Sequence, residues 1–396
     1  MGLNRELDGF LVVSIEQAVS APYCGLLLAD AGARVLKVER EEGDFARGYD
    51  QGADGNSTIF AWLNRGKESV CLDLNQGCDV ELLHSMLHKA DVFLHNLTPG
   101  TLARRGFDGD TLRKENPRLI CCEINGYGNT GNAANKKAYD FLVQAESGLC
   151  AVTGNEDAET RVGISICDIA TGLTAFSAIL RALLQRSRTG SGIDLAVSMF
   201  DVMADWMNMP LLAQRYLGGA PKRLGLTHAL IAPYGAFFCK HDEQVLISIQ
   251  SNREWKVFCN SILEQRELTD DPRFKDNTDR VAHREALHRV INDVFSRKTR
   301  VELVTLLDQN NIACGQLSSV EDLSKHEFLR NFQAQFGPSL VKMADLPVQT
   351  NAERPELVPL LNQHGNSVRA EFSLYKNRGD TRIEETQEIS FHPNSY

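Results

Sequence analysis

One aspartate, Asp168, stands where an apolar segment ends and a longer apolar-periodic segment begins. Apolar residues after it recur at steps of three and four, which predicts an amphipathic helix from Ile169 carrying Leu173, Phe176, Ile179, Leu180, Leu183 and Leu184. Asp168 is then expected as the N-cap, where free N–H groups and the helix dipole keep a carboxylate ionised and available as a nucleophile. An aspartate before a helix is more often only a cap, and the local sequence leaves both roles open.

Basic side chains recur in the loops that precede or follow the predicted strands. They are Arg40, Arg65, Lys67, Arg104, Arg105, Lys136 and Lys137. If these loops share one rim of a sheet, an acidic protein acquires a basic mouth suited to phosphate groups. Any one of these residues alone reads as a solvated loop residue, so the hypothesis rests on their repeated placement.

The composition is typical of a soluble enzyme. The chain has 396 residues, with 43% hydrophobic and 24% charged residues, a length that suggests two domains or one domain with a large insertion. We expect a cytoplasmic protein, because neither a signal peptide nor a membrane-spanning apolar run is evident. The net charge of −10 argues against nucleic-acid binding. Ten scattered cysteines read as reduced core residues, and His84 with His88 lacks a third partner for a metal site.

The first part of the chain alternates strand-like and helix-like segments. Strands are predicted at 11–16, 34–39, 69–74, 91–95 and 119–124, with helices at 23–33 and 80–88. This alternation is typical of parallel βαβ units and predicts an α/β fold with a wound parallel sheet, whose ligands collect at the carboxyl ends of the strands. The loop after the first strand, 17–22, contains neither glycine-rich phosphate fingerprint, which disfavours a nicotinamide or ATP enzyme.

The pattern changes after a further predicted strand at 193–198 and a helix at 199–217. Segments 234–239 and 245–250 predict a β-hairpin, followed by helices at 254–263, 280–295 and 301–309. We therefore expect a large α/β domain over 1–215, a smaller α/β domain over 225–325, and a return to the large domain with a polar tail over 326–396.

Several segments together resemble the family III CoA-transferases (CaiB/BaiF type), and the resemblance covers nearly the whole chain. The segments that carry it are 28–40, Asn64-Arg65-Gly66-Lys67, Leu72-Asp73-Leu74, 96–100, 137–140, 163–172 and 189–196. Each of them is weak alone, but their order along the chain makes the combination specific. The resemblance implies that the fold is that of an interlocked homodimer.

In that family the aspartate matching Asp168 is the catalytic nucleophile, and the resemblance implies the same role here. It also implies a set of residues that hold CoA: Gln17, Ala18, Arg40, Leu72, Asn75, Asn96, Leu97, Thr98, Arg104, Lys137 and Asp140. No permanently bound cofactor or metal is expected, since the CoA thioester is itself a substrate. The expected reaction moves CoA between an acyl-CoA and a carboxylic acid through an aspartyl anhydride and an aspartyl-CoA thioester.

The expected acids are C4–C5 dicarboxylates. The glycine-rich loop of formyl-CoA transferases is absent at 249–255, which makes oxalate a poor candidate, and 228–235 is more similar to the subgroup that acts on mesaconyl-CoA, itaconate, citramalate or succinyl-CoA. Transfer between molecules and within mesaconyl-CoA both remain open. A second carboxylate would need a partner such as Arg47, Arg223 or Arg253.

Two alternatives to a CoA-transferase remain. One is the related acyl-CoA racemase, which needs paired acid–base groups. That family has a histidine where this chain has Tyr139, and tyrosine is a poor base at neutral pH. The other is a non-catalytic CoA-binding protein, which predicts binding without acyl exchange.

Overall fold

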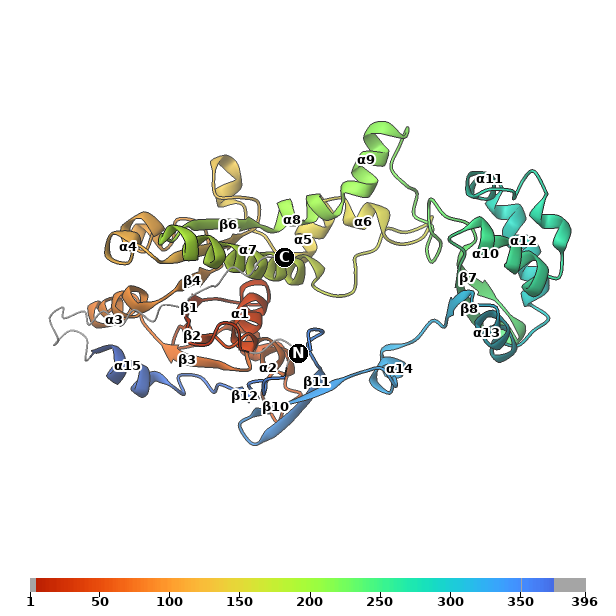
Figure 1. The fold of residues 1–396 in the computed structure, drawn as a ribbon. Coiled ribbons are helices and arrows are strands. Elements are labelled where there is room, and N and C mark those ends of the chain that lie inside the picture. Colours follow the sequence, from red (N-terminus) through yellow and green to blue (C-terminus); the bar gives the residue numbers. More distant parts are fainter. Residues whose placement is uncertain (1–4, 350, 374–396) are drawn as a thin grey trace, which may run out of the picture. The chain divides into compact units, whose positions relative to one another are not determined.

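The structure, a computed structural model, describes residues 5–349 and 351–373 and divides into two compact units (Figure 1). The first unit takes its described residues from Met1–Tyr139, Ser165–Val202 and Phe332–Tyr396, and the second consists of Asp140–Ile164 and Met203–Asn331. The polar tail expected over residues 374–396 lies outside the described residues.

The first unit contains the predicted wound parallel sheet. Its six strands lie in the order β3-β2-β1-β4-β5-β6, and every pair in it is parallel. They are β1 (Leu11–Ile15), β2 (Arg34–Glu39), β3 (Lys67–Cys71), β4 (Val92–His95), β5 (Ile120–Asn125) and β6 (Asp194–Ser198). The central strands are apolar and buried on both sides, as parallel strands between two layers of helices must be.

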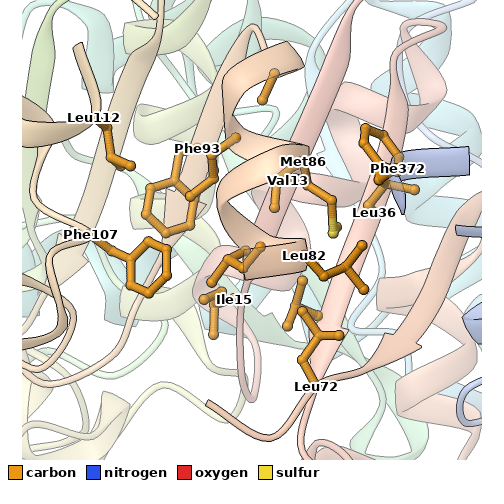
Figure 2. Close-up of a cluster of buried hydrophobic side chains, with 14 of the residues drawn as sticks. Val13, Ile15, Leu36, Leu72, Leu82, Met86, Phe93, Phe107, Leu112 and Phe372 are labelled. Atoms are coloured by element: carbon orange, nitrogen blue, oxygen red, sulfur yellow. The ribbon is translucent and has the colours of Figure 1, made fainter. Parts of the chain in front are cut away.

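Helices pack against this sheet in two groups. One group is α3 (Gly77–Lys89), α4 (Gly109–Glu115) and α15 (Gly365–Ser373), and the other is α1 (Ser20–Asp30), α2 (Thr58–Asn64) and α7 (Ile166–Thr189). Figure 2 shows the core under the first group, where Leu82 and Met86 of α3 meet Val13 and Leu36 of the sheet. Alternate strand residues such as Val13 and Leu36 point to this side, and their neighbours point to the α1 and α7 side.

The long helix α7 differs from its prediction in two ways. It begins at Ile166 with Ser165 as the N-cap, so Asp168 lies inside the first turn and the expectation that it caps the helix is wrong. The buried face is formed by small residues, including Cys167, Ala170, Gly172, Ala175 and Ala182. The helix therefore starts early enough for Cys167 to join this buried row.

The packing of α7 on α1 explains which face is buried. An ideal Cβ placed on Gly172 would lie 2.4 Å from the carbonyl oxygen of Ser20 and 3.1 Å from Tyr23 Cβ. Only a residue without a side chain lets the two backbones come this close. Three leucines of the predicted apolar row, Leu173, Leu180 and Leu184, are instead 47%, 37% and 58% exposed, whereas Ile179 of the same row is buried.

Helix α7 is also the one helix in the described part of the chain that has the length and apolar composition of a membrane span. The core helix of a globular protein passes the same test, and α7 packs on α1, β5 and β6. The finding is weak evidence for a membrane span.

The chain returns to the first unit through a small sheet of β10 (Asn331–Phe336), β11 (Ser339–Ala344) and β12 (Leu357–Val358). Phe336 stacks on Phe60 of α2 at 5.8 Å between ring centroids. The following segment covers the edge of β3, where Ser69 N–H donates to Nδ1 of His364 (3.2 Å) and Cys71 N–H donates to Oδ1 of Asn362 (2.9 Å). An edge strand that would otherwise show unpaired N–H groups is thereby closed.

The second unit contains the predicted hairpin, β7 (Tyr234–Phe238) and β8 (Gln244–Ser248), with β9 (Ala313–Gly315) as a third antiparallel strand. Its other elements are α5 (Asp140–Glu146), α6 (Leu149–Val152), α9 (Asn208–Tyr216), α10 (Asn252–Val257), α11 (Asn277–Ala282), α12 (Arg284–Phe295), α13 (Arg300–Gln309) and α14 (Val320–Ser324). The single helix predicted over 199–217 is wrong, because α8 (Met199–Trp206) and α9 are separate. Pro210 fits the first turn of α9, where its missing N–H costs nothing.

Candidate active site

Asp168 is half-buried in the first turn of α7, where the helix dipole favours a negative charge. Its electrostatic neighbour is Tyr49, which lies on the loop between β2 and α2. Partial burial and the carboxylates of Asp44 and Asp168 raise the pKa of Tyr49 to about 12. The phenol is therefore protonated at neutral pH and presents a hydrogen-bond donor in the field of Asp168.

The loop that carries Tyr49 is held at both ends by carboxylates. At its start, Asp44 caps the short 3-10 turn η1 (Phe45–Gly48) by accepting from Ala46 N–H at 3.0 Å. At its end, Asp50 accepts from Thr58 N–H (2.9 Å), Gly52 N–H (2.9 Å) and the Ser57 hydroxyl (2.8 Å). Burial opposes charge on Asp50, but these donors lower its pKa. The loop is thus fixed before any ligand arrives.

A cavity of about 480 Å³ opens at the carboxyl ends of β1, β2 and β3 and beside the loop after β4. Parallel α/β sheets bind their ligands at this end. Five of the residues expected to hold CoA line the cavity: Gln17, Arg40, Leu72, Asn75 and Leu97. They come from four different loops of the first unit, so the fold brings together residues that are far apart in the sequence.

Two other expected residues support the cavity wall. The side chain of Asn96 hydrogen-bonds to the backbone of Gln17, accepting from its N–H and donating to its carbonyl oxygen, both at 2.9 Å. Ala18 has a left-handed backbone (φ +62°), and its N–H donates to Oδ1 of Asp44 at 3.1 Å. These contacts are structural, and the side chain of Asn96 is used within the protein.

The remaining expected residues are not among those that line this cavity. Thr98, Arg104 and Lys137 are exposed on the first unit. Asp140 begins α5 in the second unit, where it accepts from the side-chain amide of the fully buried Gln144 at 2.7 Å.

Arg105 lines the cavity in place of its neighbour Arg104. One guanidinium nitrogen donates to the carbonyl oxygen of Leu74, and the other donates to Oδ1 of Asn75 at 3.0 Å. The sequence analysis named both Arg104 and Arg105 as loop cations. Which of the two faces the cavity depends on the turn geometry of the loop after β4, which the sequence does not reveal.

A largely buried ionic cluster adjoins the cavity, and its three carboxylates are among the lining residues. It consists of three cations and three carboxylates, Lys37, Lys67, Arg47, Glu16, Glu39 and Asp44. Burial lowers the pKa of Lys67 to about 8, although Glu16 at 2.5 Å opposes the shift. Burial also disfavours charge on Lys37, but Glu16 and Asp44 raise its pKa above the ordinary value. Burial would raise the pKa of Glu39, but its pairing with Arg47 brings it to about 2.

The basic mouth predicted from the loop residues is only partly present. Arg65 is buried against Asp30 at 3.1 Å, and Lys67 is enclosed in the ionic cluster, so neither can meet a phosphate. Arg40 and Arg105 remain as the cations at the cavity. The expectation failed for Arg65 because its loop precedes β3, at the other end of the sheet from the carboxyl ends, and for Lys67 because its ammonium group is buried against Glu16.

The three arginines proposed as partners of a distal carboxylate have different surroundings. Arg47 pairs with Glu39 through two contacts of 2.7 and 2.8 Å. Arg223 donates to carbonyl oxygens of the second unit and pairs with Glu159 at 3.2 Å. Arg253 is exposed at the start of α10, where the segment expected to differ from a glycine-rich loop forms a capping box between Ser251 and Glu254.

His95, at the end of β4, lines a second cavity of about 280 Å³. Burial lowers its pKa to about 4, so the imidazole is neutral at neutral pH, and its Nδ1 has no partner among the described residues. Within residues 5–349 and 351–373, no group of three His, Cys, Asp or Glu side chains is arranged to hold a metal ion.

Similarity to known proteins identifies the family. The sequence profile described as "CoA-transferase family III" matches residues 7–365, which includes Asp168 and every strand of the first unit. The chain belongs to CoA-transferase family III.

Several proteins named as CoA-transferases are similar to this chain over most of their length. An acetyl-CoA:oxalate CoA-transferase of Acetobacter aceti is 34% identical over 92% of this chain and 95% of that protein. A mouse succinyl-CoA:glutarate CoA-transferase is 32% identical over 83% and 76%. A succinyl-CoA:mesaconate CoA-transferase of Haloarcula hispanica is 30% identical over 90% and 94%. This chain is therefore a transferase of the CoA-transferase class.

Solved structures support the same family III fold. A protein of Brucella suis described as a CAIB/BAIF family member is 31% identical, with a TM-score of 0.79 over 92% of this chain and 99% of that one. A Mycobacterium tuberculosis protein is 26% identical, with a TM-score of 0.81 over 91% and 98%. The expected fold, an α/β protein with a large parallel sheet, is confirmed.

Proposed function

We propose that this family III enzyme transfers CoA to and from C4–C5 dicarboxylic acids, with Asp168 as the nucleophile. The observation that carries the proposal is the clustering of five expected CoA residues around one cavity of the unit that also contains Asp168. A volume of about 480 Å³ is within the usual range for small-molecule sites. Leu72 and Leu97 offer apolar surface to a base and Arg40 offers a cation to a phosphate, in a lining that also contains Glu16, Glu39, Glu41, Glu42, Asp44 and Asp73.

The proposed reaction keeps the thioester energy in covalent form. Asp168 attacks the thioester carbonyl carbon, forming a mixed anhydride and releasing CoA thiolate. The thiolate then attacks the aspartyl carbonyl, which gives an aspartyl-CoA thioester and frees the donor acid. The acceptor carboxylate attacks that thioester and releases the thiolate again. The thiolate finally takes the acceptor acyl group and restores Asp168.

The residues around Asp168 suit these steps. Each attack develops negative charge on a carbonyl oxygen, and preorganised hydrogen-bond donors stabilise such charge by several kcal/mol, roughly 3 per donor in known cases. The protonated phenol of Tyr49 is one candidate donor, because its loop is fixed by Asp44 and Asp50. Backbone N–H groups at the start of α7 are a second candidate. Water must be excluded, since hydrolysis would waste the thioester.

Purified protein offered succinyl-CoA and a panel of acids tests this function. The acids are glutarate, mesaconate, itaconate, citramalate and oxalate, and mass spectrometry follows the new thioesters. We expect a C4–C5 acid to give a higher kcat/KM than oxalate. Oxalate belongs in the panel because the Acetobacter aceti relative is named for it, against the expectation from residues 249–255. Mesaconyl-CoA offered alone tests transfer between its two carboxylates.

The panel also separates the alternatives. Deuterium wash-in at the α-carbon without a new thioester would identify a racemase. CoA binding without any exchange across the panel would identify a non-catalytic binding protein. Either result would contradict the proposed function.

We further propose that the enzyme works as a homodimer, which in this family is interlocked. An exposed row of leucines on α7 is proposed to contribute to the interface. Leu173, Leu180 and Leu184 repeat at steps of seven and four along one exposed side of the helix. Exposed apolar rows of this kind are typical of helix surfaces that another chain covers.

A double charge substitution tests this interface. Leu180→Glu with Leu184→Glu should lower the denaturant concentration at which the dimer unfolds, because two carboxylates would be buried without partners and interlocked chains separate only when they unfold. Both leucines are already partly exposed, so the fold of the single chain should tolerate the change. Val320→Glu, at a position that is 82% exposed, is the matched control and should unfold at the same denaturant concentration as the unmodified dimer. A double variant as stable to denaturant as the unmodified dimer would remove these leucines from the interface.

A further inference from the structure

Two loops of the first unit form the mouth of the cavity at the carboxyl ends of β1 and β2. The first contains Gln17 and Ala18, and the second runs from Arg40 to Asp44 and continues through η1 to Tyr49. Gln17, Arg40 and Asp44 all line the cavity. The loops come from different strands, so their spacing depends on whatever links them.

The side chain of Asp44 links them. Its Oδ1 accepts from Ala18 N–H of the first loop (3.1 Å) and from Ala46 N–H of the second (3.0 Å). Its Oδ2 accepts from Nζ of Lys37 at 2.9 Å. The backbone N–H of Asp44 donates to Oε2 of Glu39 at 3.0 Å, which holds the residue in place. Asp44 is only 3% exposed, so water cannot replace these contacts.

The first loop needs such support. Ala18 has φ +62°, a left-handed conformation that costs a residue with a Cβ roughly 1–2 kcal/mol. Strained backbone of this kind persists only where its surroundings hold it. Here Asn96 holds Gln17 from one side and Asp44 holds Ala18 from the other. A single carboxylate oxygen therefore sets the position of a strained backbone relative to the neighbouring loop.

We propose that Asp44 is a positioning residue that sets the spacing of the two loops around acyl-CoA, an inference that rests on the proposed function. Its Oδ1 performs this role through Ala18 and Ala46. Its Oδ2 neutralises the buried Lys37, which is a separate and structural task. Nζ of Lys37 also donates to the carbonyl oxygen of Glu16, beside the first loop, at 3.2 Å, so the role of Oδ1 is tested with Lys37 replaced in every variant.

The test compares two double variants, and both of them lack the ion pair between Lys37 and Asp44. Lys37→Met combined with Asp44→Asn removes one positive and one negative charge, so the remaining cluster keeps two cations and two carboxylates. The amide oxygen of the asparagine can still accept from the N–H groups of Ala18 and Ala46. Lys37→Met combined with Asp44→Leu has a similar side-chain shape but no acceptor. Titration calorimetry with CoA measures binding, steady-state kinetics with succinyl-CoA separates KM from kcat, and thermal unfolding reports stability.

We expect the leucine pair to bind CoA at least about tenfold more weakly than the asparagine pair, since tenfold corresponds to roughly one hydrogen bond. The loss should appear mainly in the KM for acyl-CoA. Equal CoA affinity in the two pairs would overturn the proposal and leave Asp44 as a partner of Lys37 only. If the leucine pair does not fold, Asp44→Ala in the Lys37→Met background removes the acceptor without adding bulk.

The same measurements distinguish this inference from the proposed function. Unmodified protein that does not bind CoA would contradict the function. Unmodified protein that binds CoA, together with two variants of equal affinity, would contradict only the role of Asp44.

Discussion

Replacing Asp168 by alanine should abolish CoA transfer while leaving the protein folded. The side chain lies half-buried in the first turn of α7, and no other carboxylate of the described residues occupies that turn. Removing a covalent nucleophile costs catalysis at least about 1,000-fold, because neither anhydride nor enzyme thioester can form. The measurement is the rate of new thioester formation from succinyl-CoA and its best acceptor.

The control for Asp168 is another carboxylate in the first turn of a helix of the same unit. Asp110 of α4 is highly exposed, and among the described residues its one ion pair is with Arg113, three residues later, so Asp110→Ala should keep the transfer rate of the unmodified enzyme. Incubating the unmodified enzyme with succinyl-CoA and no acceptor should also give a CoA adduct on the peptide that contains Asp168. Turnover by the alanine variant within tenfold of the original would remove Asp168 from the mechanism.

Replacing Gly172 by alanine should destabilise the first unit and slow the transfer reaction. The new Cβ would lie 2.4 Å from the carbonyl oxygen of Ser20, so α1 and α7 would have to separate. Overpacking of this kind costs about 1–3 kcal/mol and occasionally more. Because α7 carries Asp168, a shift of the helix should also lower the rate. Denaturant unfolding measures the free energy, and the transfer assay measures the rate.

Gly77 provides the matched control for Gly172. It begins α3, and no atom lies within 4 Å of the Cβ that alanine would add. Gly77→Ala should therefore be neutral or slightly stabilising, since alanine loses less backbone entropy on folding. If both alanine variants unfold at the same denaturant concentration, close approach of α1 and α7 is not what holds the two helices.

The parallel sheet and the hairpin were predictable because their signals are local. Strands such as β1 are short, largely apolar runs bounded by turns, and the hairpin of β7 and β8 is two such runs around a polar turn. The fold class follows from their alternation with helices. The identity of Asp168 as a candidate also came from sequence, through the motifs that surround it.

The site could not be predicted in the same detail, because its contacts join distant segments. Asp44 meets Ala18 across a gap of 26 residues, and nothing in the residues near Asp44 indicates that partner. The sequence predicted Lys67 as a loop cation, but its side chain is buried and forms an ion pair with Glu16. The buried face of α7 could not be predicted either. Hydrophobicity alone predicts that its leucines are buried, whereas Gly172 is buried because α1 packs closely against it.

The discontinuous chain path of the first unit has a consequence for biosynthesis. Residues 357–373, which close the edge of β3 and pack on α3, leave the ribosome after the whole of Met203–Asn331. At translation rates of about 5–20 residues per second, the nascent sheet waits on the order of ten seconds with that edge open. Open strand edges recruit other chains, so this interval is when a chaperone is most useful to the protein. Slowing translation over Met203–Asn331 should therefore lower the soluble yield more than an equal delay before Lys67, when β3 has not yet been made.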